Sequence, residues 1–182
     1  ELQNIPLYGY GVKGFMLSMV ETALRVSDNT VPHHVIEKAI AYGKDLLAKP
    51  VELLEDVQET LSQLKDQYRL VMATKGDLLD QERKLRKSGL EAYFHHIEIM
   101  SDKQEADYLS LIKHLDIAPD EFMMIGNSLK SDVLPVLSIG GHAIHVPYHT
   151  TWEHEKVEGS IEHARFHSVE TLKEILPILA LD

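Results

Sequence analysis

The chain has 182 residues, 44% hydrophobic and 26% charged, which is the balance of a globular protein with one ordinary domain, or one domain and a small appendage. Its formal net charge of −11 argues against a nucleic-acid partner, because binding a nucleic-acid backbone needs a basic surface. With no cysteine, disulfides, thiolate catalysis and cysteine-ligated zinc are excluded. No apolar run is long enough to span a bilayer and no signal peptide is visible, so we expect no membrane partner and a cytoplasmic location.

The first fifty residues predict helices only. The opening residues 6–11 contain a proline and two glycines and are expected to form a loop. Apolar residues then recur at helical spacing over 15–26, and a second helix is expected to begin near Pro32 and to end at residues 49–50. This pattern predicts a two-helix piece with a boundary near residue 50.

The remaining residues alternate between amphipathic helices and short apolar strands. This alternation predicts an α/β fold, in which a parallel sheet is covered by helices on both faces. Helices are expected at about 52–67, 78–87, 105–115, 131–138 and 169–179, and strands at 70–73, 96–99, 122–125, 143–146 and 164–166.

Polar residues follow three of these strands. In parallel sheets, ligands bind outside the carboxyl ends of the strands. Thr74 follows the strand at 70–73, Lys103 comes shortly after the next strand, and residues 126–132 follow the strand at 122–125. Each feature alone has an ordinary explanation, such as a helix cap for Thr74 or a solvated surface position for Lys103. Their common position favours phosphoryl transfer, which needs positioning and charge neutralisation more than covalent chemistry.

Three segments resemble motifs of the haloacid dehalogenase-like hydrolases. Residues 70–77 are similar to the second motif, a strand that ends in Thr or Ser, and Lys103 stands where the third motif has its lysine. Residues 124–132 resemble the fourth motif, an apolar strand followed by Gly-Asp and by a second Asp five residues on. The resemblance covers essentially the whole chain. It implies a Rossmann-like core over residues 51–182 and places residues 1–50 in a helical cap.

The resemblance also implies a role for each matching residue. Thr74 is expected to donate a hydrogen bond to a phosphate oxygen, assisted by the backbone N–H groups of Lys75 and Gly76. Lys103 is expected to neutralise the phosphate. Asp132 and Asn127 are expected to bind Mg2+, either directly or through water. Their oxygen atoms are ligands of the kind that suits magnesium.

The sequence departs from the family pattern in two places. Asn127 stands where the family more often has Asp, which lowers the negative charge of the expected metal site. The first motif, a strand followed by Asp-x-Asp that supplies the nucleophile, is missing. Asp77 and Asp80 have nearly the right spacing, but they belong to a turn and a helix. We therefore expect that the motif precedes Glu1 in a longer protein, and that residues 1–182 alone are inactive.

A loop after the strand at 143–146 contains Tyr148 and His149. Since the loop leaves the carboxyl end of a strand, these residues either border a substrate pocket or belong to an ordinary surface loop.

The sequence as a whole predicts a Mg2+-dependent phosphatase that acts on a small phosphorylated metabolite through an aspartyl-phosphate. Two alternatives stay open: a haloacid dehalogenase, which shares the fold but displaces halide without metal, and a binding or regulatory protein that keeps the fold without catalysis. The oligomeric state is open as well.

Overall fold

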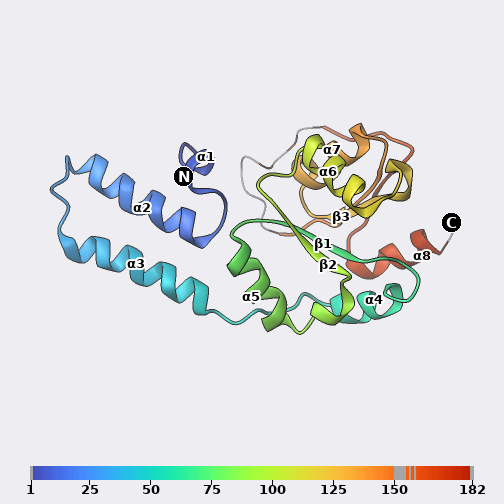
Figure 1. Cartoon of the computed structure of the whole chain (residues 1–182), viewed down its shortest axis with the longest axis horizontal. Helices are drawn as coiled ribbons and strands as arrows, with labels where there is room; N and C mark the ends of the chain where they lie inside the picture. Colours follow the sequence, from blue (N-terminus) through green and yellow to red (C-terminus); the bar gives the residue numbers. More distant parts are fainter. Residues whose placement is uncertain (1, 150–154, 156, 158, 181–182) are drawn as a thin grey trace. The chain divides into compact units, whose positions relative to one another are not determined.

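The computed structural model describes residues 2–149, 155, 157 and 159–180. The chain forms two compact units, one made of Glu1–Leu53 and Arg69–Ser101 and the other of Leu54–Tyr68 and Asp102–Asp182. Each unit contains a parallel sheet flanked by helices, so the fold is the Rossmann-like α/β type that the sequence predicts (Figure 1). The expected division into a cap and a core at residue 50 stays a prediction.

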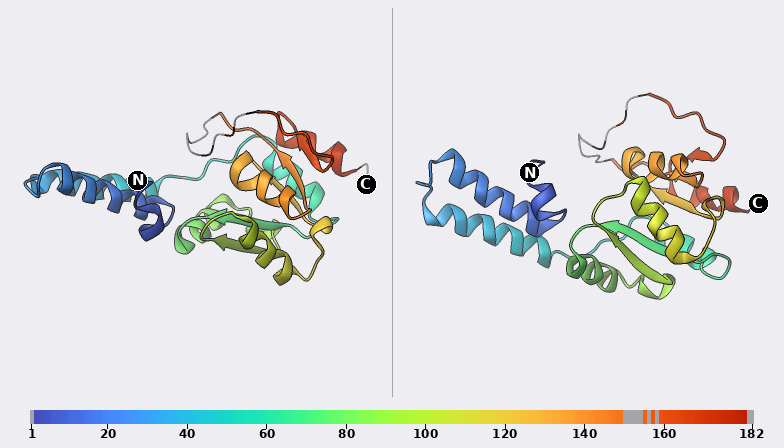
Figure 2. Two further views of the ribbon diagram at one scale, coloured as in Figure 1. Left: turned by 90° about the horizontal axis from the view of Figure 1, so that it is seen from above. Right: turned by 45° about the horizontal axis from the view of Figure 1, so that its top comes forward.

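The first unit begins with helices and continues into a two-stranded sheet. Helices α2 and α3 pack against each other and lie side by side in Figure 1 and in the right view of Figure 2. Strands β1 and β2 pair in parallel, with Thr74 opposite Ile99. The elements of this unit are α1 (Ile5–Tyr8), α2 (Val12–Val26), α3 (His33–Ala48), β1 (Val71–Lys75), α5 (Leu78–Ser88), η1 (Glu91–Tyr93) and β2 (His96–Met100).

Two of these elements differ from the sequence-based expectation. Residues 5–8, expected as loop, form the short helix α1, because Pro6 suits the first turn and the Asn4 carbonyl accepts hydrogen bonds from the N–H groups of Leu7 and Tyr8. Strand β1 extends to Lys75, so Thr74 lies inside the strand rather than after it.

The second unit surrounds a three-stranded parallel sheet in the order β3-β4-β5. Gly126 at the end of β3 is paired with His145 at the end of β4, so the segments that follow both strands leave from the same edge. The elements are α4 (Val57–Leu64), α6 (Glu105–Leu115), η2 (Pro119–Glu121), β3 (Met123–Gly126), the π-helical turn η3 (Leu129–Val133), α7 (Leu134–Ser138), β4 (His142–His145), β5 (Phe166–Ser168), η5 (Leu172–Glu174) and α8 (Ile175–Leu179).

The core of the second unit is mostly apolar. The largest fully buried side chains come from α4, α6, η3, α7, β4 and α8; they are Thr60, Tyr108, Leu111, Val133, Val136, Ile144 and Ile175. The segment that follows helix α4 is joined to the end of α8 by a hydrogen bond of 2.8 Å from the Tyr68 hydroxyl to the Leu179 carbonyl. Helix α4 is shorter than the expected helix at 52–67, because Asp56 has a left-handed backbone with φ 61° and begins it late. None of the helices over the described residues is long and apolar enough to cross a membrane.

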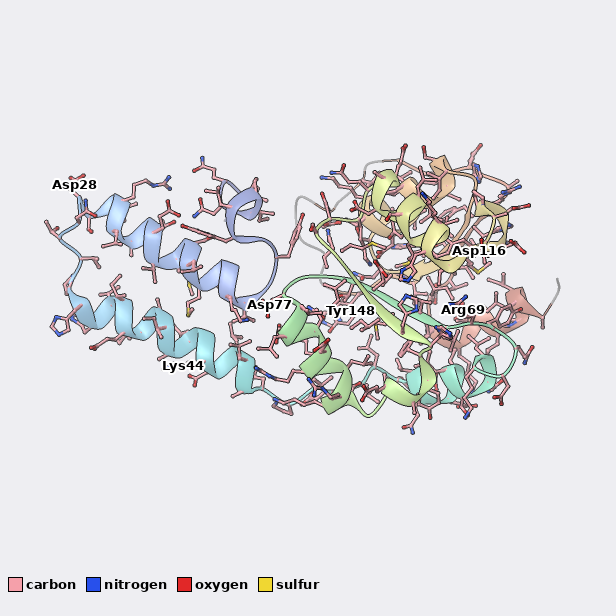
Figure 3. All side chains as sticks on the ribbon, in the orientation of Figure 1. Asp28, Lys44, Arg69, Asp77, Asp116 and Tyr148 are labelled. Atoms are coloured by element: carbon pink, nitrogen blue, oxygen red, sulfur yellow. The ribbon has the colours of Figure 1, made fainter. Side chains whose placement is uncertain are left out.

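An ion pair joins the start of α2 to the turn after β1. Lys13 Nζ lies 2.7 Å from Asp77 Oδ1, and the same carboxylate caps α5 by accepting the N–H of Asp80 (Figure 3). The hydrogen bond from Lys13 holds the pKa of Asp77 below its ordinary value, with a smaller contribution from Asp80. A carboxylate with a lowered pKa in the folded state stabilises the fold above its unfolded pKa, and this contribution is lost as the pH falls through the folded value.

Replacing Lys13 with Met is therefore expected to lower the free energy of unfolding at pH 7 by less than about 1 kcal/mol, as for other partly exposed pairs. The difference from the wild type should shrink as the pH falls from the ordinary pKa of an aspartate toward the lowered pKa of Asp77, where the carboxylate becomes protonated in the folded wild type as well. Denaturant unfolding from pH 7 to pH 3 measures this difference, and Lys44→Met on the exposed side of α3 is the control. A difference that stays constant down to pH 3 would contradict the assignment.

Candidate active site

Lys103 and Asp132, which are 29 residues apart in the sequence, form a buried ion pair. The Lys103 Nζ lies 2.7 Å from Asp132 Oδ1, and the two side chains are only 10% and 6% exposed. Removing two charges from water is costly unless they are paired and hydrogen-bonded, and these two satisfy each other. The structure therefore brings together the cation and the carboxylate that the sequence singled out separately.

Lys103 is fixed by the start of helix α6. Its backbone N–H donates to Asp102 Oδ1 at 2.8 Å. Gln104 caps the helix, and its own N–H donates to the Asp107 carboxylate at 3.0 Å. The backbone on both sides of Lys103 is thus held by local side chains, which gives its long side chain a defined starting point.

Asp132 lies in the π-helical turn η3, and the sequence-based expectation of a helix from residue 131 was wrong here. The helical backbone begins at Leu129 because the Ser128 carbonyl accepts from the N–H groups of both Asp132 and Val133, the second being the wider π-type bond. Ser128 is also the cap, since its hydroxyl accepts the N–H of Ser131 at 3.0 Å. In return, Asp132 Oδ2 accepts the Ser128 N–H at 3.0 Å.

Gly126 leaves room for the Asp132 carboxylate. A Cβ atom at position 126 would lie 2.7 Å from Asp132 Cβ and closer still to its carboxyl group. Such a contact is far below van der Waals distance, so the side chain of Asp132 would have to move. The glycine at the end of β3 is therefore required by the position of Asp132.

Replacing Gly126 with Ala is expected to weaken the binding of Mg2+ by about 10- to 100-fold, the range typical of a disturbed ligand position. Overpacking should also lower the free energy of unfolding by about 1–3 kcal/mol. Titration calorimetry with MgCl2 and denaturant unfolding measure the two effects. Gly89→Asn is the matched control, since an added Cβ at position 89 meets nothing within 4 Å and Asn tolerates its φ of 72°. Unchanged Mg2+ affinity in Gly126→Ala would remove Asp132 from the metal site.

Asn127 follows β3 directly and is held through its backbone. His145 at the end of β4 places its Nε2 3.1 Å from the Asn127 carbonyl oxygen. Beneath the loop, the Tyr108 hydroxyl donates to the Ser131 carbonyl at 2.9 Å. Burial raises the pKa of Tyr108, and the nearby carboxylates, Asp132 first, raise it further, so the hydroxyl stays a donor. Sequence reasoning assigned no role in the site to His145 or Tyr108.

A pocket of about 580 Å³ opens beside Lys103. Its walls come from the start of α6 and from the turn that carries Asp132, and they include the side chains of Asp102, Lys103, Gln104, Lys130, Ser131 and Pro135. The pocket therefore lies between the start of α6 and the turn η3, both of which belong to the second unit.

The other residues expected to bind phosphate belong to the first unit. Among the described residues, the Thr74 hydroxyl makes two long contacts of 3.4 Å, to Gln81 Oε1 and to the Lys75 carbonyl. Gly76 has a φ of 138°, a backbone conformation that favours glycine, and it allows the chain to turn from β1 into α5. The Lys75 ammonium lies 4.4 Å from the centre of the Tyr10 ring, a cation–π contact. The expected phosphate-binding role of this turn stays a prediction.

Tyr148 and His149 lie side by side after β4. Their ring centres are 4.0 Å apart, and the Tyr148 side chain is 39% exposed. The rest of the expected substrate loop, residues 150–154, lies outside the described residues. The proposed contact of these two rings with a substrate is untested.

Comparisons with known proteins agree with the motifs. A model for the family of haloacid dehalogenase-like hydrolases matches residues 4–140. A solved haloacid dehalogenase-like family hydrolase from Xanthomonas campestris is 35% identical with a TM-score of 0.88, and the match covers 100% of this chain and 73% of that one.

Two further relatives are phosphatases by name. N-Acylneuraminate-9-phosphatase of Rattus norvegicus is 30% identical over 109 residues, which are 57% of this chain and 44% of that protein. The chain thus spans less than half the length of this relative. A predicted phosphoglycolate phosphatase from Haemophilus somnus is 17% identical with a TM-score of 0.66, covering 94% of this chain and 78% of that one, and shows the likeness of fold alone.

Proposed function

Since the chain belongs to the haloacid dehalogenase-like hydrolases, we propose that it is part of a Mg2+-dependent phosphatase that acts on a small phosphate ester through an aspartyl-phosphate. The observation that carries this proposal is the buried pair of Lys103 and Asp132, with 2.7 Å between Nζ and Oδ1. A fixed ammonium beside a fixed carboxylate supplies both charges that the reaction needs, one toward the phosphate and one toward a metal ion.

The residues around Asp132 have the chemistry that magnesium requires. The carboxylate of Asp132 and the amide oxygen of Asn127 are hard oxygen ligands, and Mg2+ uses few protein ligands while it keeps several waters. Each carboxylate oxygen has two lone pairs, so Asp132 accepts from Lys103 and Ser128 and still has a lone pair on each oxygen for a cation. Bound there, magnesium would neutralise charge on the transferring phosphoryl group.

The remaining roles follow the resemblance. Lys103 neutralises the phosphate, while the Thr74 hydroxyl and the backbone N–H groups of Lys75 and Gly76 donate hydrogen bonds to its oxygens. The weak contacts of the Thr74 hydroxyl, both 3.4 Å, support this role because they are easily exchanged for a phosphate oxygen. The attacking aspartate is not assigned to a residue of this chain: Asp77 caps α5, and Asp80 lies within that helix.

The proposed substrate is a small phosphorylated metabolite. The name of the rat relative supports this, since it denotes a phosphatase of a phosphorylated sugar acid. Tyr148 and His149 are proposed to border the substrate. A cytoplasmic location stays a prediction.

Phosphate release by the full-length protein tests the proposal. The panel contains N-acylneuraminate 9-phosphate, phosphoglycolate and simple sugar phosphates, each with MgCl2 and with EDTA. We expect release of phosphate from at least one ester with MgCl2 and none with EDTA. Release of halide from 2-chloropropionate without metal would instead establish the dehalogenase. Binding of an ester without turnover under any condition would establish a binding or regulatory protein.

A further inference from the structure

Glu155 places its carboxylate on the turn that carries Asp132. The Ser131 hydroxyl donates to Glu155 Oε2 at 2.6 Å, and the Ser128 hydroxyl donates to the same oxygen. Both serines are buried, at 6% and 9% exposure, and they lie 24 and 27 residues before Glu155. Glu155 is therefore attached to the segment after β3 at the two residues that shape the metal turn.

The two serines connect Glu155 to Asp132. Ser128 donates its N–H to Asp132 Oδ2, and its hydroxyl accepts the N–H of Ser131. The hydroxyls are thus oriented by Glu155, while the backbone beside them orients Asp132. A carboxylate acceptor makes such hydrogen bonds about twice as strong as neutral ones, so Glu155 fixes the turn more firmly than a neutral residue would.

Glu155 also adds negative charge near the expected metal site, which lacks a carboxylate at position 127. Asn127 is neutral, whereas the family more often has a carboxylate at that position. Both Asp132 and Glu155 raise the pKa of Tyr108, which places the two carboxylates in the electrostatic environment of one buried hydroxyl. A second carboxylate near the turn favours the retention of a divalent cation.

We propose that Glu155 is a positioning residue of the magnesium site, which holds Asp132 in its metal-binding orientation through Ser128 and Ser131 and offsets the neutral Asn127. This inference rests on the proposed function. It assigns a structural task to a residue outside all of the family motifs.

The test uses the full-length protein and measures the dissociation constant for Mg2+ by titration calorimetry. Glu155→Ala and Ser131→Ala are each expected to raise it about tenfold, as is typical of lost support behind a metal ligand. The double variant should bind Mg2+ no more weakly than Glu155→Ala alone, because Glu155→Ala already removes the hydrogen bond that Ser131→Ala breaks. Glu155→Gln keeps an acceptor for both hydroxyls but removes the charge, so its loss of Mg2+ affinity should lie between that of the wild type and that of Glu155→Ala. Glu162→Gln, an exposed glutamate of the same segment, is the matched control.

Three results would overturn the proposal: wild-type affinity in Glu155→Ala, additive losses in the double variant, or a loss in Glu155→Gln as large as in Glu155→Ala, which would make Glu155 a direct ligand. A second measurement needs neither metal nor substrate. Hydrogen exchange of the amides of residues 128–133 in EDTA should be faster in Glu155→Ala than in the wild type, and equal rates would overturn the positioning role. If the protein released no phosphate, the difference in hydrogen-exchange rate between Glu155→Ala and the wild type could still be measured. A failure of the positioning role is therefore distinguishable from a failure of the proposed function.

Discussion

Replacing Asp132 with Asn is expected to lower the magnesium-dependent turnover of the full-length protein by at least about 100-fold. Asn has nearly the same volume and keeps an acceptor for Lys103, but it removes the charge that draws the cation. Loss of a metal that stabilises charge in the transition state costs several kcal/mol, and about 2.7 kcal/mol already corresponds to 100-fold. The measurement is the steady-state rate of phosphate release as a function of MgCl2 concentration.

The buried ion pair makes Asp132→Asn a better test of the metal assignment than Asp132→Ala. Asp132→Ala leaves the Lys103 ammonium, 10% exposed, without its partner, and breaking a buried pair costs about 3–5 kcal/mol of stability. Asp132→Asn avoids most of this loss of stability, because Asn keeps an acceptor for Lys103. Asp116→Asn is the matched control: it removes a carboxylate from the same unit, and Asn tolerates its φ of 56°. Wild-type turnover and magnesium dependence in Asp132→Asn would show that the metal assignment is wrong.

Replacing Lys103 with Met is expected to lower turnover by about 100- to 1000-fold, the effect of removing one preorganised charge from a transition state. The same change leaves the Asp132 carboxylate, 6% exposed, without its cation, and stability should fall by about 3 kcal/mol. Turnover and denaturant unfolding measure the two losses. Lys113→Met, which removes an exposed lysine of α6, is the control. An unchanged rate would show that Lys103 has no role in turnover.

A double variant separates the two roles of the pair. Combining Lys103→Met with Asp132→Asn removes both charges, so it should recover much of the lost stability, because no unpaired charge remains buried. It should recover no turnover, because both charges of the proposed site are gone. Recovery of turnover together with stability would mean that the pair only holds the fold.

The order of helices and strands was predictable because most of it depends on local patterns. Helix α6 (Glu105–Leu115) was expected at 105–115, and its apolar periodicity, acidic first turn and basic last turn all point to one helix. Lys103 and Asp132 were each singled out by the resemblance, but their direct pairing was not predicted, because they follow strands of separate sheets.

The support around this pair was not predictable, because it depends on contacts between distant segments. Nothing in the sequence near Glu155 indicates that its carboxylate meets Ser128 and Ser131. His145 and Tyr108 gave no signal either, since a histidine in a strand and a tyrosine in an amphipathic helix have ordinary packing roles. The π-helical turn over 129–133 was missed because its wider hydrogen bond is set by Ser128, whereas the apolar pattern predicts only a helix.

The most direct test of the account is a crystal structure of the full-length protein grown with MgCl2 and tungstate, an analogue of phosphate. We expect a magnesium ion at about 2.0–2.1 Å from a carboxylate oxygen of Asp132. A tungstate oxygen should lie within hydrogen-bond distance of Lys103 Nζ, about 2.7–2.9 Å. Magnesium and tungstate bound elsewhere, with Lys103 and Asp132 still paired only to each other, would contradict the central claim that these two residues hold the phosphate and the metal.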